Sequence, residues 1–432
     1  MQSFEPGLAG LIPELRWRGL FHAASEGLEA RLAAGRPIAG YNGFDPSGPW
    51  LHIGHLIPIF GLLHLQRHGG RPIVVVGGGT GMIGDPSGKS TERNLMARPE
   101  IEANVEVMRA QFERLLDFSG AGAAQLVDNH DWLAPFHLLD WLRDVGKHFT
   151  VPYMLAKDSV QLRLERGLSF TEFSYMLIQA TDFSHLHRTL GVELQMGGAD
   201  QWGNITAGLE LIRREAGGAP HPGAPGAYAL AYPLLLSPSG AKFGKTEAGE
   251  SVWLHPDGTS PYAFFQHWLN TDDRDVPVYL RWFTTMNPGQ IESLEAELAD
   301  HAERRAAQRA LAEDVTARVH GRETATAVIR ASELLFEPGP IRDPATLEHI
   351  HRVVGGFVAA PELVAAGVLA VLAETGLAPS RGEARRLVHG GAVTINGEAV
   401  RDAGAPMPEP IDGRWFEVRI GKRRREVGRL QT

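Results

Sequence analysis

The chain has 432 residues and a formal net charge of −9 at pH 7, with 43% apolar and 22% charged residues. This length exceeds one ordinary core, so two or three globular domains are expected. The absence of cysteine excludes disulfides, thiolate metal sites and cysteine nucleophiles, and it fits a reducing compartment. The longest apolar runs fall well short of the roughly 20 residues of a membrane-spanning helix. We therefore expect a soluble, cytoplasmic, multidomain protein.

Residues 41–55 read YNGFDPSGPWLHIGH and follow a short buried strand that is predicted at residues 38–41. Glycine and proline at such density indicate a turn after a strand, and the apolar spacing of residues 56–70 predicts that a short helix follows. His52 and His55 are therefore expected where a turn becomes a helix N-terminus. The unpaired N–H groups of such a terminus suit an anion such as a phosphate.

A second buried strand is predicted at residues 72–76, and it leads into the loop GGGTGMIGDPSGKS at 77–90. Residues 79–84 match the spacing of a dinucleotide-binding fingerprint, but the DPSG that follows breaks the helix that this motif requires. Residues 88–90 resemble the end of a Walker A loop, whose first glycine would fall at Ile83. We favour over both a loop that brings backbone close to a ligand at the carboxyl edge of a sheet. The polar groups that would face this ligand are Asp85, Lys89 and Arg93.

The chain then alternates predicted helices and strands up to about residue 215. An amphipathic helix is expected over 99–118 and a strand at 126–129, and helical spacing recurs over 132–146 and 169–180. This alternation is typical of a doubly wound α/β domain with a parallel sheet.

Polar residues line one face of the helix that is predicted over residues 170–182. Tyr175, Gln179 and Asp182 recur at steps of four and three, which places them on the same side. That face is either solvated or the wall of a polar site, and this segment alone leaves both possibilities open. The sequence QMGGADQW at 195–202 then reads as a strand end running into a glycine-rich turn, where open α/β sheets bind ligands.

A last strand is predicted at 234–236, before the polar loop AKFGKT at 241–246. Lys242 and Lys245 flank a glycine there and form a cationic loop, although solvated surface lysines are common. From residue 261 to 335 the composition is helical, with one long helical stretch predicted over 291–320.

The last part of the chain is basic. Residues 376–432 contain eleven Lys or Arg and seven Asp or Glu, a local net charge of +4. A helix that opens at Ser380 carries Arg381, Arg385 and Arg386, and a tight Asn-Gly turn is expected at 396–397. A second basic cluster contains Lys422, Arg423, Arg424 and Arg425. A small α+β module with a cationic face suits an RNA backbone, although charge alone also fits a solvated face.

Taken together, these residues resemble the bacterial tyrosyl-tRNA synthetases, which are class I aminoacyl-tRNA synthetases, over nearly the whole chain. His-Ile-Gly-His at 52–55 is similar to the class I HIGH signature, and KFGKT at 242–246 is similar to the tyrosyl form of the KMSKS loop. Four more family blocks follow in the family's order: GFDP at 43–46, GDPS at 84–87, TEFSY at 171–175 and DQWGN at 200–204. The C-terminal segment resembles an S4 RNA-binding domain.

The resemblance implies four parts of the chain. These are a Rossmann-like α/β catalytic domain with a parallel sheet at 1–250, an α-helical domain at 251–340, a linker at 341–365 and a small α+β S4-like domain at 366–432.

The resemblance also implies tyrosine–tRNA ligase activity in two steps. Tyrosine attacks the α-phosphate of ATP to give tyrosyl-adenylate and pyrophosphate, and the tyrosyl group then passes to the 3′-terminal adenosine of tRNA(Tyr). Catalysis would rest on positioning and on stabilising charge at the phosphates. Mg²⁺ is expected with ATP. No organic cofactor and no structural metal are expected, since a lone His-x-x-His makes a poor metal site. The family further implies a homodimer.

Residue roles follow from the matched motifs. The catalytic residues would be His52, His55, Lys242 and Lys245. Tyrosine would be bound by Tyr41 and Asp182 at its hydroxyl, by Asp85, Tyr175 and Gln179 at its α-amino group, and by Gln201 near its carboxyl group. ATP would be bound by Gly43, Asp45, Ser47, Asp200 and Thr246, together with His52, His55 and Lys245. The tRNA would be bound by Arg381, Arg385, Arg386, Lys422, Arg423 and Arg424.

Three positions depart from the family pattern. Asn42 stands where a cysteine near the ribose is common, Ser47 replaces a common threonine, and Thr181 stands where a tyrosine is more usual. None of these changes removes a group that the chemistry requires.

Two alternatives remain at this stage. A tryptophanyl-tRNA synthetase is the closest class I relative, but it lacks an S4 tail and would not need Asp182. A binding-only RNA protein would not need His52, His55, Lys242 and Lys245, all of which are present.

Overall fold

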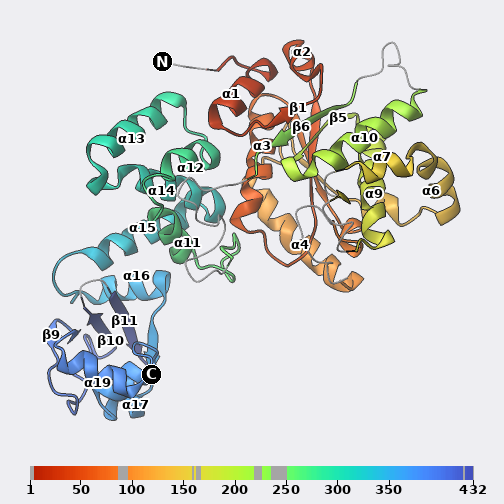
Figure 1. Ribbon diagram of the computed structural model, residues 1–432. Helices are drawn as coiled ribbons and strands as arrows, with labels where there is room; N and C mark the ends of the chain where they lie inside the picture. The colour runs from red at the N-terminus through yellow and green to blue at the C-terminus, as the bar shows by residue number, and fades with distance from the viewer. Residues whose placement is uncertain are drawn as a thin grey trace. The chain divides into compact units, whose positions relative to one another are not determined.

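The structure is a computed structural model, which describes residues 4–85, 96–157, 160–161, 167–217, 226–234, 251–421 and 424–431 (Figure 1). The chain forms two compact units. The first contains Met1–Thr259 and His267–Val319, and the second contains Ser260–Gln266 and His320–Thr432. The four-part division expected from the sequence stays a prediction. Among the described residues, no helix is both long and apolar enough to cross a bilayer.

A six-stranded sheet forms the centre of the first unit. Its strands are β1 (Ala23–Ala24), β2 (Ala39–Phe44), β3 (Arg71–Val76), β4 (Gln125–Asp128), β5 (Val192–Gly198) and β6 (Tyr228–Tyr232). Their order is β1-β6-β5-β2-β3-β4, and all neighbours are parallel except the short edge strand β1. Strands β3 and β5 are buried along nearly their whole length, as in parallel sheets with helices on both faces. The predicted α/β class is confirmed.

Alternate residues of β2 face different helices, because successive strand side chains point to opposite faces. Tyr41 packs edge-on against Phe183 of α9 (Phe170–Leu190), with ring centroids 5.5 Å apart. Its neighbour Asn42 donates a hydrogen bond to the Pro58 carbonyl of α3 (Leu56–Arg67), at 2.9 Å. Consecutive residues of one strand thus contact helices on opposite sides of the sheet.

The other elements of the first unit are short helices and connecting turns. Its remaining α-helices are α1 (Leu11–Arg18), α2 (Leu28–Ala33), α4 (Arg98–Leu115), α5 (His130–Leu133), α6 (Leu138–Asp144), α7 (Val151–Leu155), α10 (Trp202–Glu215), α12 (Val276–Phe283) and α13 (Pro288–Asp300). The 3₁₀ turns are η1 (Leu8–Gly10), η2 (Ile53–His55), η3 (Thr80–Met82), η4 (Gly146–His148), η5 (Ala199–Gln201) and η6 (Ala302–Arg304). The chain passes between the units within α11 (Pro261–Leu269) and at the end of α14 (Ala306–His320).

Three predicted elements differ from the structure. The stretch 132–146 contains two short helices, α5 and α6, rather than one. The stretch 291–320 is interrupted between α13 and α14, where Arg305 has a left-handed φ of 53° and donates a hydrogen bond to the Leu269 carbonyl at 2.6 Å. This distant contact outweighs the local helix propensity. The strand predicted at 234–236 is also displaced, since β6 ends at Tyr232 and Leu234 is outside any strand, while residues 235–236 lie outside the described part.

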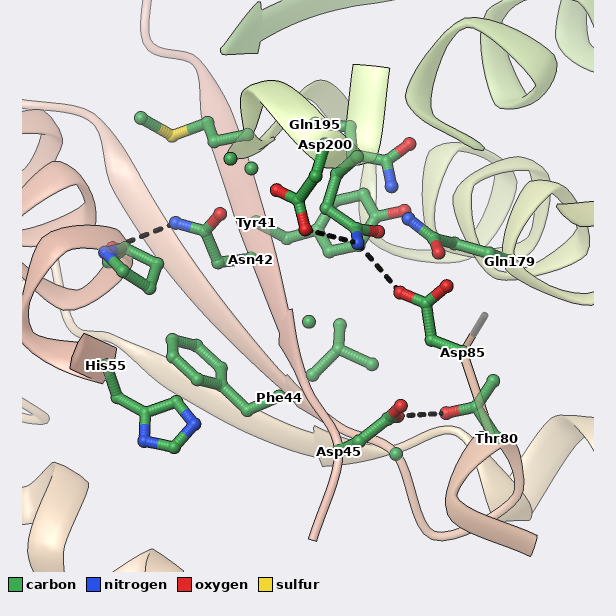
Figure 2. Close-up of a pocket in the computed structure, with 18 of the residues that line it drawn as sticks. Tyr41, Asn42, Phe44, Asp45, His55, Thr80, Asp85, Gln179, Gln195 and Asp200 are labelled. Atoms are coloured by element: carbon green, nitrogen blue, oxygen red, sulfur yellow. Dashed lines mark hydrogen bonds between the residues drawn. The ribbon is translucent and has the colours of Figure 1, made fainter. Parts of the chain in front are cut away.

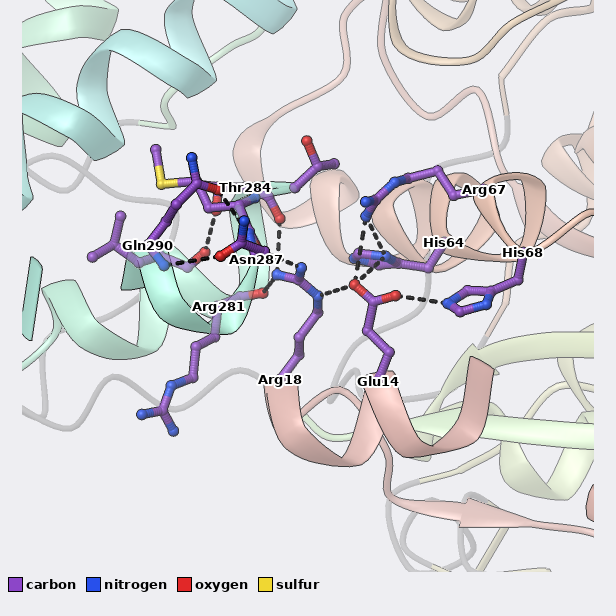
Figure 3. A network of polar contacts seen from close by, with 12 residues as sticks. Glu14, Arg18, His64, Arg67, His68, Arg281, Thr284, Asn287 and Gln290 are labelled. Atoms are coloured by element: carbon purple, nitrogen blue, oxygen red, sulfur yellow. Dashed lines mark hydrogen bonds and ion pairs between the residues drawn. The ribbon is translucent and has the colours of Figure 1, made fainter. Parts of the chain in front are cut away.

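A buried polar network joins α1, α3 and α12 of the first unit (Figure 3). The Glu14 carboxylate accepts hydrogen bonds from Arg18 Nε at 2.8 Å and from His68 Nε2 at 2.7 Å. The guanidinium of Arg18 also donates to the carbonyls of Arg281 and Thr284 at the end of α12, at 2.9 and 3.0 Å. These carbonyls lack partners within their helix, so Arg18 satisfies them. The network fixes α3, the helix that begins directly after His55.

The second unit contains a five-stranded sheet. Its strands are β7 (Phe357–Ala359), β8 (Val393–Ile395), β9 (Glu398–Ala399), β10 (Trp415–Ile420) and β11 (Arg424–Leu430), in the order β7-β11-β10-β8-β9. Its helices are α15 (Arg322–Phe336), α16 (Pro344–Val354), α17 (Pro361–Ala365), α18 (Val368–Glu374) and α19 (Arg381–His389). As predicted, Ser380 caps α19, and Asn396 and Gly397 form a turn with positive φ angles of 52° and 85°.

Candidate active site

A cavity of about 420 Å³ lies in the first unit, at the carboxyl ends of β2, β3 and β5 and beside the start of α3 (Figure 2). This is the edge where open α/β sheets bind ligands. Eleven residues assigned above to tyrosine or ATP line it: Tyr41, Gly43, Asp45, Ser47, His55, Asp85, Tyr175, Gln179, Asp182, Asp200 and Gln201. Residues that are up to 160 positions apart in the sequence therefore share one cavity.

The His-Ile-Gly-His turn forms one wall of this cavity. His52 is the N-cap of η2, and its Nδ1 accepts a hydrogen bond from the Gly54 N–H at 3.0 Å. In return, the His52 N–H donates to His55 Nδ1, also at 3.0 Å. A side chain at Gly54 would come within 2.8 Å of the His52 ring, so glycine is required between the two histidines. The predicted position, where a turn becomes a helix, is confirmed.

These backbone hydrogen bonds determine the histidine tautomers. Because each Nδ1 is an acceptor, the neutral ring carries its proton on Nε2. Burial, with a smaller contribution from His52, lowers the pKa of His55 to about 3, so that this ring is neutral at pH 7. His55 therefore presents an N–H donor rather than a fixed positive charge to a ligand in the cavity.

A buried carboxylate, Asp182 of α9, lies at the opposite side of the cavity. It accepts hydrogen bonds from Asn129 Nδ2 at 3.0 Å and from Trp132 Nε1 at 2.8 Å. Burial raises the pKa of Asp182 to about 7, although both of these hydrogen bonds act to lower it. Among the side chains that the structure describes, two neutral donors and no cation are bonded to this carboxylate, which leaves it able to bind one more donor.

Within the described part of the chain, two polar atoms of the cavity lining are buried and have no hydrogen-bond partner. They are the hydroxyl of Tyr41 and Oε1 of Gln195, whose residues are each 2% exposed. Burial raises the pKa of Tyr41 well above its usual range, and the nearby charge of Asp182 raises it further. An unpaired buried polar atom costs about 1–3 kcal/mol, so a ligand group or water is expected to pair with each.

Asp45, at the end of β2, is held by two hydroxyl groups. Thr80 Oγ1 donates to one of its carboxylate oxygens at 2.8 Å and Tyr175 donates to the other at 3.1 Å. Asn129 extends this chain, because its Nδ2 donates to both Thr80 Oγ1 and Asp182, each at 3.0 Å. One amide therefore connects the two carboxylates.

The remaining polar residues of the cavity form a second connected group. Gln201 Nε2 donates to Asp85 at 2.7 Å, and Gln201 Oε1 accepts from Asn204 at 3.2 Å. Asn204 also donates to Gln179 at 3.1 Å. Burial raises the pKa of Asp200. The single polar face predicted for Tyr175, Gln179 and Asp182 is part of the cavity lining, so its solvated alternative is excluded.

The three departures from the family pattern differ in their surroundings. Asn42 lines the cavity, and its Nδ2 donates to Tyr232 at 3.3 Å as well as to Pro58. Ser47 also lines the cavity. Thr181 is buried away from the lining, where it donates to the Leu177 carbonyl at 2.8 Å and accepts from Trp141 at 3.2 Å.

Several predicted residues lie outside the part of the chain that the structure describes. These are Lys89, Arg93, Lys242, Lys245, Thr246, Lys422 and Arg423. Conversely, sequence reasoning gave no role to five polar residues of the cavity and its surroundings: Thr80, Asn129, Trp132, Gln195 and Asn204. Four of them lie in segments that the sequence marked as sites, the loop at 77–90, the strand end at 126–129, QMGGADQW at 195–202 and DQWGN at 200–204, whereas no signal marked Trp132. Within the described ranges, no group of three or more His, Asp or Glu side chains could hold a metal ion.

In the second unit, the predicted RNA-binding arginines are exposed. The side chains of Arg381, Arg386 and Arg424 are 67%, 79% and 47% exposed and form ion pairs with Glu374, Glu383 and Glu426 respectively. Arg425, the next residue of this cluster, is buried and donates to the carbonyls of Leu334 and Gly339. The first three arginines can reach a partner, whereas Arg425 stabilises the unit itself.

Comparison with known proteins agrees with this geometry. Residues 33–337 match the family model of class I tRNA synthetases (W and Y), and residues 368–406 match that of the S4 domain. A tyrosine–tRNA ligase of Anaeromyxobacter dehalogenans is 50% identical, covering 96% of this chain and 98% of its own, and that of Geobacillus stearothermophilus is 46% identical with the same coverage.

A solved structure is similar over about three-quarters of the chain. The C-terminally truncated mitochondrial tyrosyl-tRNA synthetase of Aspergillus nidulans aligns with a TM-score of 0.66 and 27% identity, covering 76% of this chain and 94% of its own. The chain belongs to the class I tRNA synthetases of the tryptophan and tyrosine group.

Proposed function

We propose that this member of the family is a tyrosine–tRNA ligase, as its curated relatives are. It activates tyrosine with ATP and transfers the tyrosyl group to the 3′-terminal adenosine of tRNA(Tyr). The observation that carries the choice of tyrosine is the pair of buried groups at one end of the cavity. The Tyr41 hydroxyl has no partner in the described structure, and the Asp182 carboxylate has only neutral donors.

This pair supports recognition of a phenolic hydroxyl. The Tyr41 hydroxyl would donate a hydrogen bond to the phenolic oxygen of the substrate. The Asp182 carboxylate would accept a hydrogen bond from the phenolic O–H. Phenylalanine would leave both groups unpaired in a buried site. Sites of this kind reject an analogue that lacks the hydroxyl by roughly 10⁴–10⁵, a magnitude measured on tyrosyl-tRNA synthetases themselves. The carboxylate of Asp85 and the hydroxyl of Tyr175 would hold the α-ammonium group, with Gln179 beside them.

In the first step, a tyrosine carboxylate oxygen attacks the α-phosphorus of ATP, and the bond to the bridging oxygen breaks to release pyrophosphate. His52 and His55 would donate their Nε2–H groups to phosphate oxygens as charge develops there. Gly43, Asp45, Ser47, Asp200 and Gln201 would position the nucleotide, and Lys242, Lys245 and Thr246 would contribute from their own loop. Mg²⁺ would enter with ATP, bound mainly by phosphates and water.

In the second step, a hydroxyl of the terminal adenosine attacks the tyrosyl carbonyl and AMP leaves. The exposed arginines of the second unit, Arg381, Arg385, Arg386 and Arg424, with Lys422 and Arg423, would bind the tRNA backbone. Such contacts are electrostatic, so tRNA binding should weaken as salt increases. A cytoplasmic location belongs to the same proposal, because the tRNA is found there.

A homodimer completes the proposal. The first unit exposes Leu138, Leu139, Val151 and Phe170, each more than 55% accessible, and such concentrations of exposed apolar side chains are typical of protein interfaces. A second copy of the chain is the partner that we propose for this surface.

The test is ATP–pyrophosphate exchange by the purified protein with L-tyrosine, L-tryptophan and L-phenylalanine in turn. We expect exchange with tyrosine only, followed by charging of tRNA(Tyr). Exchange that depends on tryptophan would identify the tryptophanyl alternative. The absence of exchange with every amino acid, while tRNA still binds, would favour the binding-only alternative.

A further inference from the structure

Three aromatic side chains lie beside the His-Ile-Gly-His turn but outside the cavity. The ring of Trp50 stacks on that of His255, with centroids 5.5 Å apart and an interplanar angle of 3°. Trp50 also meets Trp253 edge-on, with centroids 5.9 Å apart. We refer to Trp50, Trp253 and His255 as the aromatic clasp.

Backbone hydrogen bonds join the two segments that carry the aromatic clasp, residues 50–53 and residues 252–255. The Leu254 N–H donates to the Leu51 carbonyl at 2.8 Å, and the Ile53 N–H donates to the Val252 carbonyl at 3.0 Å. His52 and Trp253 form an isolated antiparallel bridge between these two hydrogen bonds. The backbone of His52 is therefore held by a segment that follows it by 200 residues.

The aromatic contacts continue from the clasp into the cavity wall. The Trp253 ring meets that of His52 edge-on, with centroids 6.1 Å apart. The His52 and His55 rings are 3.9 Å apart, and His55 lines the cavity. Because these rings contact one another, a displacement of Trp50 or Trp253 would change the position of the His52 ring and, through it, that of His55.

The turn that carries the clasp is itself closely constrained. The Trp253 N–H donates to Thr259 Oγ1 at 2.9 Å, and His255 Nδ1 accepts from the Asp257 N–H at 3.3 Å, which orients the imidazole. A Cβ at Gly258 would lie 2.6 Å from the Trp50 ring and 2.8 Å from Trp253. Only glycine leaves room for both tryptophans.

We propose that the aromatic clasp positions His52 and His55 for adenylate formation. Trp50, Trp253 and His255 are then positioning residues of the first step, since they act through the histidines and lie outside the cavity lining. This inference rests on the phosphate-binding role of His52 and His55 in the proposed function. A misplacement of about 1 Å in reacting groups can cost about 100-fold in rate.

The test compares Trp50→Ala, His255→Ala and Gly258→Ala with the wild type in ATP–pyrophosphate exchange. We expect kcat to fall roughly tenfold to a hundredfold, with KM for tyrosine unchanged, because the tyrosine-binding residues are at the other side of the cavity. Trp50→Phe and His255→Phe keep an aromatic ring in place and should restore most of the kcat. Thermal unfolding of each variant shows whether it is folded at the assay temperature.

Two substitutions serve as matched controls. His301→Ala removes a histidine with a similar carboxylate contact, since His301 Nδ1 is 3.6 Å from Glu303 and His255 Nδ1 is 3.7 Å from Asp257. Gly122→Ala adds a methyl group where no atom lies within 4 Å. Both should retain the wild-type kcat.

The proposal is overturned if folded Trp50→Ala and His255→Ala retain the wild-type kcat, or if the phenylalanine variants lose as much kcat as the alanine variants. It is also overturned if kcat is unchanged and only KM for tyrosine rises. Should Trp50→Ala not fold, His255→Ala decides, because His255 is partly exposed and its removal leaves no large cavity. A wild-type protein without tyrosine-dependent exchange would instead refute the proposed function.

Discussion

Two buried carboxylates of the first unit, Glu14 and Asp182, have pKa values shifted in opposite directions. They are 4% and 3% exposed, and Glu14 accepts hydrogen bonds from Arg18, Arg67 and His68, whereas Asp182 accepts them from Asn129 and Trp132. Burial alone would raise both pKa values. At Glu14 the hydrogen bond from His68 and the charge of Arg18 outweigh burial and hold the pKa well below its usual range (Figure 3). At Asp182 the donors are an amide and an indole, and burial raises the pKa to about 7.

The opposite pKa shifts distinguish Glu14, a carboxylate that stabilises the fold, from Asp182, a carboxylate that is available to a ligand. Glu14 is paired with a cation inside the protein, so its charge is compensated whether or not a ligand is present. Asp182 has no such partner in the part of the chain that the structure describes, and it lines a cavity, so a ligand that donates a hydrogen bond would stabilise its charged form. A carboxylate with a raised pKa in a cleft is a typical feature of functional sites. Five predictions test this comparison.

The largest effect is expected at the structural carboxylate. Replacing Glu14 with Ala leaves Arg18 and its neighbours buried without their counter-charge, and it should lower the free energy of unfolding by about 3–5 kcal/mol. Urea denaturation measures this loss. Glu29→Ala removes the partner of an exposed ion pair with Arg16 and should change stability by less than about 1 kcal/mol. Equal effects of the two substitutions would contradict the role assigned to the network.

Asp182→Asn should have the opposite profile, with a loss of function rather than of stability. Removing a charged acceptor costs about 1.5–3 kcal/mol per hydrogen bond, so kcat/KM for tyrosine should fall roughly 10- to 200-fold. The free energy of unfolding should change by less than in Glu14→Ala, because the removal of a buried charge offsets the cost of placing the amide NH₂ opposite one of the two donors. A variant that is unstable but keeps its preference for tyrosine over phenylalanine would show that Asp182 is structural.

The raised pKa of Asp182 also predicts a pH dependence. As the pH falls below about 7, protonation removes the charged acceptor, so kcat/KM for tyrosine should fall by up to about tenfold per pH unit. Asp182→Asn should abolish this limb of the profile. If the limb persisted in the variant, another group would be responsible for it.

The same two pKa shifts affect stability in opposite senses. The pKa of Asp182 is above its unfolded value of 3.8, so its contribution to stability is fully present below about pH 4 and is lost as the pH rises through about 7. The pKa of Glu14 is below its unfolded value of 4.5, so its contribution is present above that pH and is lost as the pH falls. Unfolding of Glu14→Gln and Asp182→Asn at pH 3, 5 and 8 separates the two, because the effect of Glu14→Gln should change between pH 5 and pH 3 and that of Asp182→Asn between pH 5 and pH 8.

The smallest effect is expected at the residue that connects Asp182 with Thr80. Asn129→Ala removes one of the two donors to Asp182, which lowers stability by about 1 kcal/mol. Because that donor lowers the pKa of Asp182, its loss should shift the acid limb of kcat/KM to higher pH. A limb at the wild-type position would show that Asn129 has no influence on this carboxylate. Asn287→Ala, which removes the N-cap of α13, is a control of similar stability cost with no expected shift.

Local sequence patterns predicted those parts of the protein whose determinants are close together in the chain. The spacing of His52, Gly54 and His55 was sufficient for the turn at the start of α3, because its hydrogen bonds join residues two and three apart. The Ser380 cap and the Asn396–Gly397 turn are local in the same way. The family motifs further predicted which residues line the cavity.

Only the tertiary structure decided the features that depend on distant contacts. Asn129 and Trp132 reach Asp182 across 53 and 50 residues, and no periodicity marks them as its donors. The interruption between α13 and α14 follows from a contact of Arg305 with residue 269, 36 positions away. The charge of a buried carboxylate depends on what surrounds it in space. The sequence therefore determined where Asp182 and Glu14 lie on their helices, and the packing of other segments around them determined their opposite pKa shifts.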